Sequence, residues 1–105
     1  MKVSWVMDFK NLEQKAENAS SLLKALANEK RLLIVCILSQ GEKNVGELEQ
    51  IVGLSQSALS QHLARLRRDG VVETRREAQT IFYTIKNKDV LKVLQTLCDI
   101  YSPVA

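Results

Sequence analysis

Cysteine and histidine are scarce in this chain, and their scarcity excludes several kinds of functional site. There are two cysteines, Cys36 and Cys98, and one histidine, His62. The cysteines lie far apart, with no C-x-x-C motif and no Cys/His cluster, so neither a disulfide scaffold nor a zinc finger is expected. A single histidine, no Ser/His/Asp set and no glycine-rich phosphate loop leave nothing to assemble a catalytic centre. We therefore predict that the protein is not an enzyme and uses no cofactor.

A long hydrophobic run is missing as well. No apolar stretch is long enough to span a membrane, and the apolar run in Met1–Asp8 is too short for a signal peptide. We expect a cytoplasmic protein with no membrane partner. With 105 residues, 46% of them hydrophobic, the chain is predicted to form one domain over residues 1–105, and its modest core leaves room for stabilisation by a second subunit.

The positive charge of the chain is concentrated in one segment. The formal net charge is +3, and acidic and basic residues balance outside the segment from Leu54 to Arg76. Within it, Asp69 and Glu73 are outnumbered by arginines, namely Arg65, Arg67, Arg68, Arg75 and Arg76. A net charge gathered in this way is typical of a phosphate-binding surface.

The same segment has the pattern of a helix that reads DNA. At about 100° per residue, Leu59, Leu63 and Leu66 fall on one side of a helix, which predicts a buried face. The opposite side has small and polar side chains and no carboxylate; it comprises Ser57, Gln61, Ala64 and Arg68, flanked by Ser60 and Arg65. Hydroxyl and amide groups can hydrogen-bond bases and phosphates, and no acid is present to repel phosphate. We predict that this face contacts DNA.

A shorter helix is predicted directly before it, over Val45–Val52, with a tight turn at Gly53–Leu54. Two helices joined in this way form a helix-turn-helix. Gly70 is expected to terminate the second helix.

Two further helices precede this motif. Apolar residues at helical spacing predict a first helix over about 8–27. Asn28 is predicted to cap a second helix, over about 29–39, which Gly41 ends. The run Leu32–Leu38 is apolar on every side, so we expect this second helix to be buried at the centre of the domain.

Two short segments rich in β-branched and aromatic residues, Val71–Arg75 and Thr80–Ile85, follow the helix-turn-helix. Between them, Arg76–Gln79 is predicted to form the tip of a β-hairpin. Such a hairpin is the wing of a winged helix, and Arg75, Arg76 and Gln79 lie where a wing can reach the DNA backbone or minor groove. The predicted fold is mainly α with a small β-hairpin, a winged helix-turn-helix of order α-α-α-α-β-β-α.

The last predicted helix, over about 88–101, has an unusually wide apolar face. Its apolar residues cover roughly half of the circumference, wider than the ~100° stripe that docks on one core. We expect this helix to pack with the first one across a two-fold axis, forming a homodimer that presents two recognition helices about one DNA turn apart. The alternative is a terminal helix wholly buried within one monomer.

Several motifs together resemble the ArsR/SmtB family of winged-helix bacterial repressors: Leu23–Asn28, Lys30–Ile34, Val45–Leu48, Leu54–Leu63 and Leu66–Val72. The segment Thr74–Tyr83 is similar to the subgroup that includes BigR, HlyU and NolR. The resemblance implies a dimeric repressor or anti-silencer that binds an imperfect palindrome in double-stranded DNA, with readout by Gln56, Ser57, Ser60 and Gln61. His62, at the border of the buried face, is predicted to pack or to contact phosphate. A winged helix used only for protein contacts is the rival interpretation.

A metal site is not expected. Metal-sensing members of the family place cysteine pairs in the helix matching Val45–Val52, or an Asp/His set in the last helix. Asp89 and Asp99 have no histidine beside them and cannot form a nitrogen-rich tetrahedral site.

The resemblance also implies a switch that responds to reactive sulfur or oxidants through two cysteines. Cys36 matches the first of these family cysteines. The second family cysteine lies at the position that is Ser102 in this chain, one helical turn beyond Cys98. Two interpretations stay open: Cys98 takes over the partner role, or both thiols are inert and the chain is like the NolR type. Free cysteine is often buried simply as a small hydrophobe. The match of Cys36 and a cysteine in the last helix favour a sensor made of Cys36 and Cys98.

Overall fold

The computed structural model describes Ser4 and residues 9–102. Its elements follow in the order α1 (Phe9–Leu26), α2 (Glu29–Leu38), β1 (Lys43–Asn44), α3 (Val45–Val52), α4 (Gln56–Arg68), β2 (Val72–Glu77), β3 (Thr80–Ile85) and α5 (Asp89–Tyr101). The predicted first residue of α1, Asp8, lies outside the described residues, as do most of Met1–Asp8 and the last three residues of the predicted domain.

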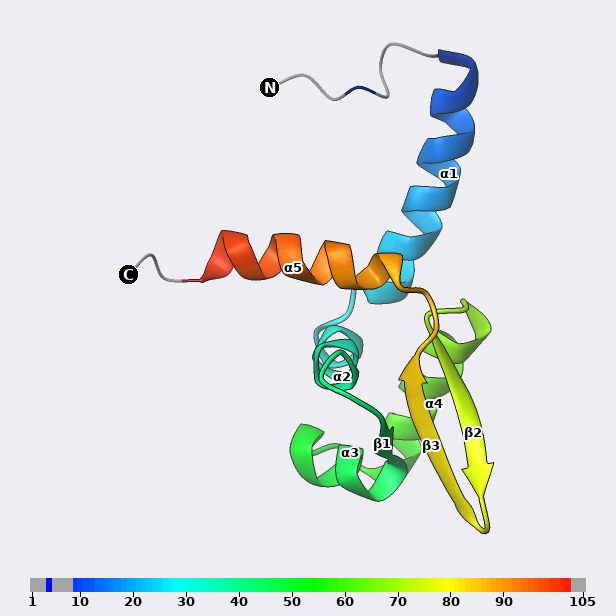
Figure 1. Ribbon diagram of the computed structural model, residues 1–105, viewed down its shortest axis with the longest axis vertical. Helices are drawn as coiled ribbons and strands as arrows, with labels where there is room; N and C mark the ends of the chain where they lie inside the picture. The colour runs from blue at the N-terminus through cyan, green and yellow to red at the C-terminus, as the bar shows by residue number, and fades with distance from the viewer. Residues whose placement is uncertain (1–3, 5–8, 103–105) are drawn as a thin grey trace.

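Over the described residues, the fold is the predicted winged helix-turn-helix, with five α-helices and a β-hairpin (Figure 1). The prediction missed β1, which is only two residues long and therefore has no visible periodicity. In β1, Lys43 pairs with Tyr83 and Asn44 with Phe82. The resulting antiparallel sheet has the order β1-β3-β2, so the hairpin is joined to the segment that leads into α3.

The core lies where α2, α3 and α4 meet the base of the hairpin. Leu59, Leu63 and Leu66 of α4 are fully buried, which confirms the predicted inward face of this helix. They pack with Ile34 and Leu48 among other buried residues. Burial of one such side chain contributes about 1.5–3 kcal/mol. The core therefore fixes how α4 is rotated, and so which of its side chains face outward.

Helix α2 begins as predicted, because the Asn28 side chain accepts hydrogen bonds from the backbone N–H groups of Lys30 (2.9 Å) and Arg31 (3.0 Å). The prediction that α2 is buried on every side is wrong. Leu33 is 39% exposed and Cys36 is also exposed. The physical reason is that the neighbouring helices α1 and α5 extend away from the body of the protein instead of closing around α2 (Figure 1).

The structure confirms the tight turn predicted between α3 and α4, and Gly53 adopts the left-handed conformation there, with a φ of 74°. Asn44 and Glu47 form a reciprocal capping box at the start of α3. Ser55 caps α4 by accepting a hydrogen bond from the N–H of Ala58 at 3.2 Å. These local bonds set the bounds of both helices of the motif.

The tip of the wing is shorter than predicted. Arg76 and Glu77 pair with Ile81 and Thr80 and so belong to the strands. Only two residues make the turn, and Ala78 has a φ of 57°. Two-residue hairpin turns require positive φ and usually carry Gly or Asn, so a turn with alanine gives no signal in the sequence.

Helices α1 and α5 project from the body in different directions (Figure 1). Their inner ends join the core through residues such as Leu26 and Val90, whereas Phe9 is 78% and Tyr101 is 81% exposed. The domain measures 50 × 37 × 21 Å along its principal axes. Over the described part of the chain, no helix is both long and apolar enough to cross a membrane.

Candidate nucleic-acid interface

The outward face of α4 is exposed along most of its length. Of the residues predicted to contact DNA, Gln56, Ser57, Ser60, Gln61 and Arg68 are exposed. His62 is half-buried, as expected at the border of the inward face, and Arg65, predicted to flank the outward face, is half-buried too. With Leu59, Leu63 and Leu66 in the core, α4 presents its polar side chains to the outside and is held from behind.

A groove of about 530 Å³ lies between α4 and the wing. It brings together three predicted residues from separate elements, Gln56 and Ser60 of α4 and Gln79 at the hairpin tip. Sequence reasoning missed its other lining residues, which are Asn44, Val45, Gly46, Thr80, Ile81 and Tyr83. No local signal marks them, because the groove exists only once β3 pairs with β1 beside α3. Its polar side chains can hydrogen-bond to the edge of a DNA groove or to a phosphate.

Two of the predicted arginines share a carboxylate at the end of α4. Arg65 Nε donates to Asp69 Oδ2 at 2.7 Å, and Arg68 Nε lies 3.6 Å from Asp69 Oδ1. The hydrogen bond from Arg65 lowers the pKa of Asp69, so the carboxylate stays ionised at neutral pH. The helix face itself has no acid, but Asp69 partly offsets the positive charge at its C-terminal end.

Arg75 has a different setting from the one expected from the sequence. Its guanidinium binds Glu42 through two hydrogen bonds, Nε to Oε2 at 2.8 Å and Nη2 to Oε1 at 2.6 Å, and Glu77 through Nη1 at 2.9 Å. The bonds from Arg75 lower the pKa of Glu42, and those from Glu42 and Glu77 raise the pKa of Arg75. Two carboxylates therefore hold the Arg75 guanidinium, although the residue remains exposed. Arg76 and Gln79 of the wing are exposed as well.

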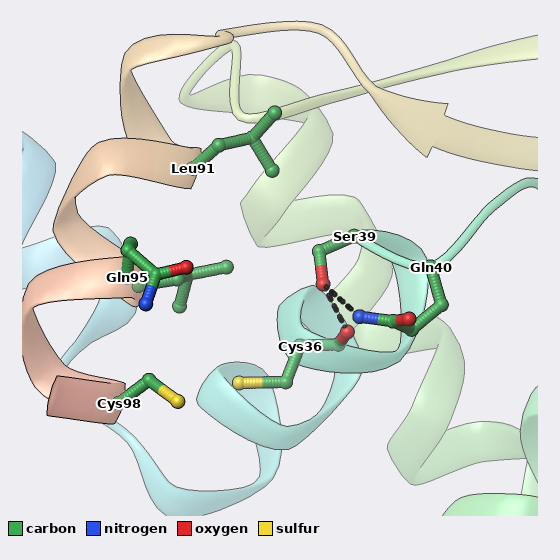
Figure 2. Close-up of a pocket in the computed structure, with 7 residues that line it drawn as sticks. Cys36, Ser39, Gln40, Leu91, Gln95 and Cys98 are labelled. Carbon is green, nitrogen blue, oxygen red and sulfur yellow. Dashed lines mark hydrogen bonds between the residues drawn. The ribbon is translucent and has the colours of Figure 1, made fainter.

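A second site lies away from this interface, between α2 and α5. A cavity of about 360 Å³ is lined by both cysteines together with Ser39, Gln40, Leu91, Leu94 and Gln95. Figure 2 shows the Cys36 and Cys98 side chains pointing toward one another from the two helices. Both thiols are free. The structure thus brings together the two residues that the sequence marked as a candidate pair.

The surroundings of the two thiols differ. Although Cys36 is exposed as a residue, partial burial of its thiol raises the pKa, and the neighbouring Cys98 raises it further. A thiol with a raised pKa is a poorer nucleophile at neutral pH than an ordinary one. The Cys98 sulfur lies 3.5 Å from the hydroxyl of Ser102, which itself donates to the Cys98 carbonyl. The Ser102 position is therefore adjacent to Cys98 at the end of α5. Among the residues that the structure describes, no three His, Cys, Asp or Glu side chains gather in a way that would hold a metal ion.

The fold and the interface define a class of protein. Two helices joined by a tight turn, an exposed polar face on the second helix and a wing beside it make a winged helix-turn-helix DNA-binding protein. The family model described as bacterial regulatory protein, arsR family, matches residues 28–74, from the cap of α2 into β2. The chain belongs to this family of transcriptional regulators, which confirms the family predicted from its motifs.

Individual relatives agree with this assignment. The chain is 52% identical over 95 residues to the transcriptional activator HlyU of Vibrio cholerae, a match that covers 90% of this chain and 88% of HlyU. It is 56% identical over 86 residues to the nodulation protein NolR of Rhizobium meliloti, covering 82% and 70% of the two chains. The crystal structure of the transcriptional repressor BigR from Xylella fastidiosa matches with a TM-score of 0.85 at 39% identity, covering 92% and 99%. One relative is an activator and another a repressor, so similarity alone sets no direction of regulation.

Proposed function

We propose that this protein is a homodimeric regulator that binds an imperfect palindrome in double-stranded DNA and is switched by oxidation or reactive sulfur at Cys36 and Cys98. The observation that supports DNA reading best is the groove in which Gln56 and Ser60 of α4 meet Gln79 of the wing. It lies at the start of α4, the end of a recognition helix that contacts base edges.

In this proposal α4 enters the major groove with its exposed polar side chains toward the bases. Glutamine can form two hydrogen bonds with adenine, and serine can bond to several bases or to phosphate. Gln56, Ser57, Ser60 and Gln61 read the sequence, while Arg68, Arg76 and Gln79 contact the backbone or the minor groove. His62 and Arg65 assist at the edge of the contact.

The proposed dimer uses the projecting helices. Ile100 is 63% and Tyr101 is 81% exposed on α5, and Phe9 and Leu23 are exposed on α1. An apolar-lined groove of about 490 Å³, with Leu22, Leu23 and Val93 in its walls, lies between the two helices. A second copy packed there buries these side chains and gives two recognition helices related by a two-fold axis, which fits a palindromic site.

The proposed switch is a covalent link between α2 and α5. An organic disulfide RSSR converts the two thiols into a Cys36–Cys98 disulfide and two RSH molecules, so that the protein is oxidised and the reagent reduced. Two persulfide molecules RSSH convert the thiols into a trisulfide, releasing two RSH and one molecule of hydrogen sulfide. Either link ties α5 to α2. The link lowers DNA affinity if the linked protein favours another angle between the subunits. The loss of binding free energy cannot exceed the difference between the free energies of forming the link in the two dimer arrangements.

DNA binding is tested by selecting duplexes from a random-sequence library with the reduced protein. The expected product has two related half-sites centred about 10 bp, or a multiple of that, apart. Enrichment of no sequence would contradict the proposed specificity, and a single half-site would contradict the dimer.

The switch is tested on the selected duplex by titration with reductant, a disulfide oxidant or a persulfide donor. Mass spectrometry identifies the link between the cysteines. Cys36→Ser and Cys98→Ser should each abolish the loss of affinity. Unmodified thiols with full DNA binding would instead favour the second interpretation, a regulator of the NolR type whose cysteines are inert.

A further inference from the structure

Arg75 joins two parts of the chain that are far apart in sequence. Glu42 directly precedes β1, and β1 leads into α3 of the helix-turn-helix. The fork of Arg75 binds both carboxylate oxygens of Glu42, at 2.8 and 2.6 Å. A third hydrogen bond, from Nη1, reaches Glu77 within the wing at 2.9 Å. The guanidinium is therefore held by one carboxylate on the body of the motif and one on the wing.

The strand register places Arg75 on the outer face of the wing. Arg76 pairs with Ile81, and Ile81 lines the groove beside α4. Because successive side chains alternate between the faces of a strand, Arg75 lies on the opposite face from Arg76. Arg75 pairs with Phe82, and its guanidinium stacks over that ring, with Cζ 4.4 Å from the ring centroid. Arg75 thus faces away from the groove in which Gln56, Ser60 and Gln79 gather.

We propose that Arg75 is a positioning residue, which ties the wing to Glu42 and so sets the angle at which Arg76 and Gln79 approach DNA. This inference rests on the proposed DNA-binding function. Exposed ion pairs contribute little to stability, and both Arg75 and Glu77 are well exposed. Two parallel bonds between a guanidinium and a carboxylate do, however, fix relative orientation. A lysine, as a point charge with no fork, cannot replace this geometry.

The test compares affinities for a duplex selected by the wild-type protein and for an unrelated duplex, over a series of salt concentrations. Arg75→Lys keeps the charge and removes the fork, whereas Glu42→Ala removes the tie on the other side. Glu73→Ala is the matched control for Glu42→Ala. Glu73 is an exposed acidic residue of β2, and its replacement changes the net charge by the same amount as the replacement of Glu42. Thermal unfolding reports whether each variant remains folded.

We expect Arg75→Lys and Glu42→Ala each to lower the ratio of specific to non-specific affinity about fivefold, with no such change for Glu73→Ala. The double variant should lose no more than either single one, since both break the same tie. Three results would each overturn the proposal. The first is a ratio of specific to non-specific affinity that does not change in Glu42→Ala. The second is a wild-type ratio in Arg75→Lys together with a slope of log affinity against log salt that is shallower by about 0.9 in Arg75→Ala, which would indicate a direct phosphate contact. The third is a loss of stability in these variants with no change in the ratio. A wild-type protein that prefers no sequence would instead refute the proposed function itself.

Discussion

The side chains of Cys36 and Cys98 point toward each other across a single cavity between α2 and α5 (Figure 2). Helix α5 otherwise joins the body through only a few packed side chains, such as Val90, Val93 and Leu94. A covalent bond across this cavity would therefore add a tie between α5 and α2 to these packing contacts. In the proposed function, this relationship connects oxidation of the cysteine pair to the arrangement of the dimer.

The first prediction concerns the titration of Cys36. In the Cys98→Ser variant, alkylation by iodoacetamide should rise with a midpoint above the usual thiol pKa of about 8.5, because burial is the main cause of the raised pKa and remains in this variant. The same protein unfolded in urea is the control and should titrate at the usual value. Equal midpoints in the two states would refute the burial argument.

The raised pKa of Cys36 also makes the free energy of unfolding depend on pH. A thiol that is harder to ionise in the folded state favours folding most below its usual pKa, and this contribution is lost as the pH rises through the raised value.

The second prediction concerns the reading face of α4. Gln61→Ala should weaken binding to the selected duplex by about 1–3 kcal/mol if the amide makes a bidentate contact with a base. Because Gln61 is exposed, the far-UV circular dichroism and the melting temperature should not change. Gln14→Ala, on the part of α1 that projects from the body, is the matched control. Equal affinities for all three proteins would remove Gln61 from the interface.

The third prediction concerns the dimer. Ile100→Glu places a charge on the exposed apolar face of α5 and should convert the protein to a folded monomer, because Ile100 takes no part in the core. Gln95→Glu adds the same charge about 140° away around α5, at another exposed position, and should remain dimeric. Sedimentation velocity at micromolar concentration measures both. Wild-type protein that sediments as a monomer would refute the dimer, and dimeric Ile100→Glu would move the interface elsewhere.

The fourth prediction concerns the wing. Ala78 has a φ of 57° in the turn between β2 and β3, a conformation that is strained for residues with a Cβ atom. Ala78→Gly should therefore raise the free energy of unfolding by about 0.5–1 kcal/mol. Ala58→Gly, inside α4, is the opposite control and should lower it by about 1 kcal/mol. Urea denaturation measures both changes, and a loss of stability in Ala78→Gly would contradict the strain at this turn.

Most of the helices could be predicted because their signals are local. Asn28 and Gly53 act on backbone groups within a few residues of themselves, and the spacing of Leu59, Leu63 and Leu66 defines the inward face of α4 without knowledge of the partner. The outward face of α4 followed from the same spacing. The family resemblance likewise rested on continuous motifs.

The remaining features depend on contacts between distant segments, which no local pattern records. Only the pairing of β1 with β3 brings Glu42 to Arg75 and so forms an ion pair that no local pattern in the sequence predicts. The groove beside Gln56 arises from the same pairing. The directions of α1 and α5 decide that Leu33 and Cys36 stay exposed, although the sequence made α2 apolar all round. Sequence by itself determined the elements and the faces they bury, because backbone caps and periodicity act within a few residues. Tertiary structure alone decided which charges meet and which apolar faces remain open, because those depend on how the elements pack.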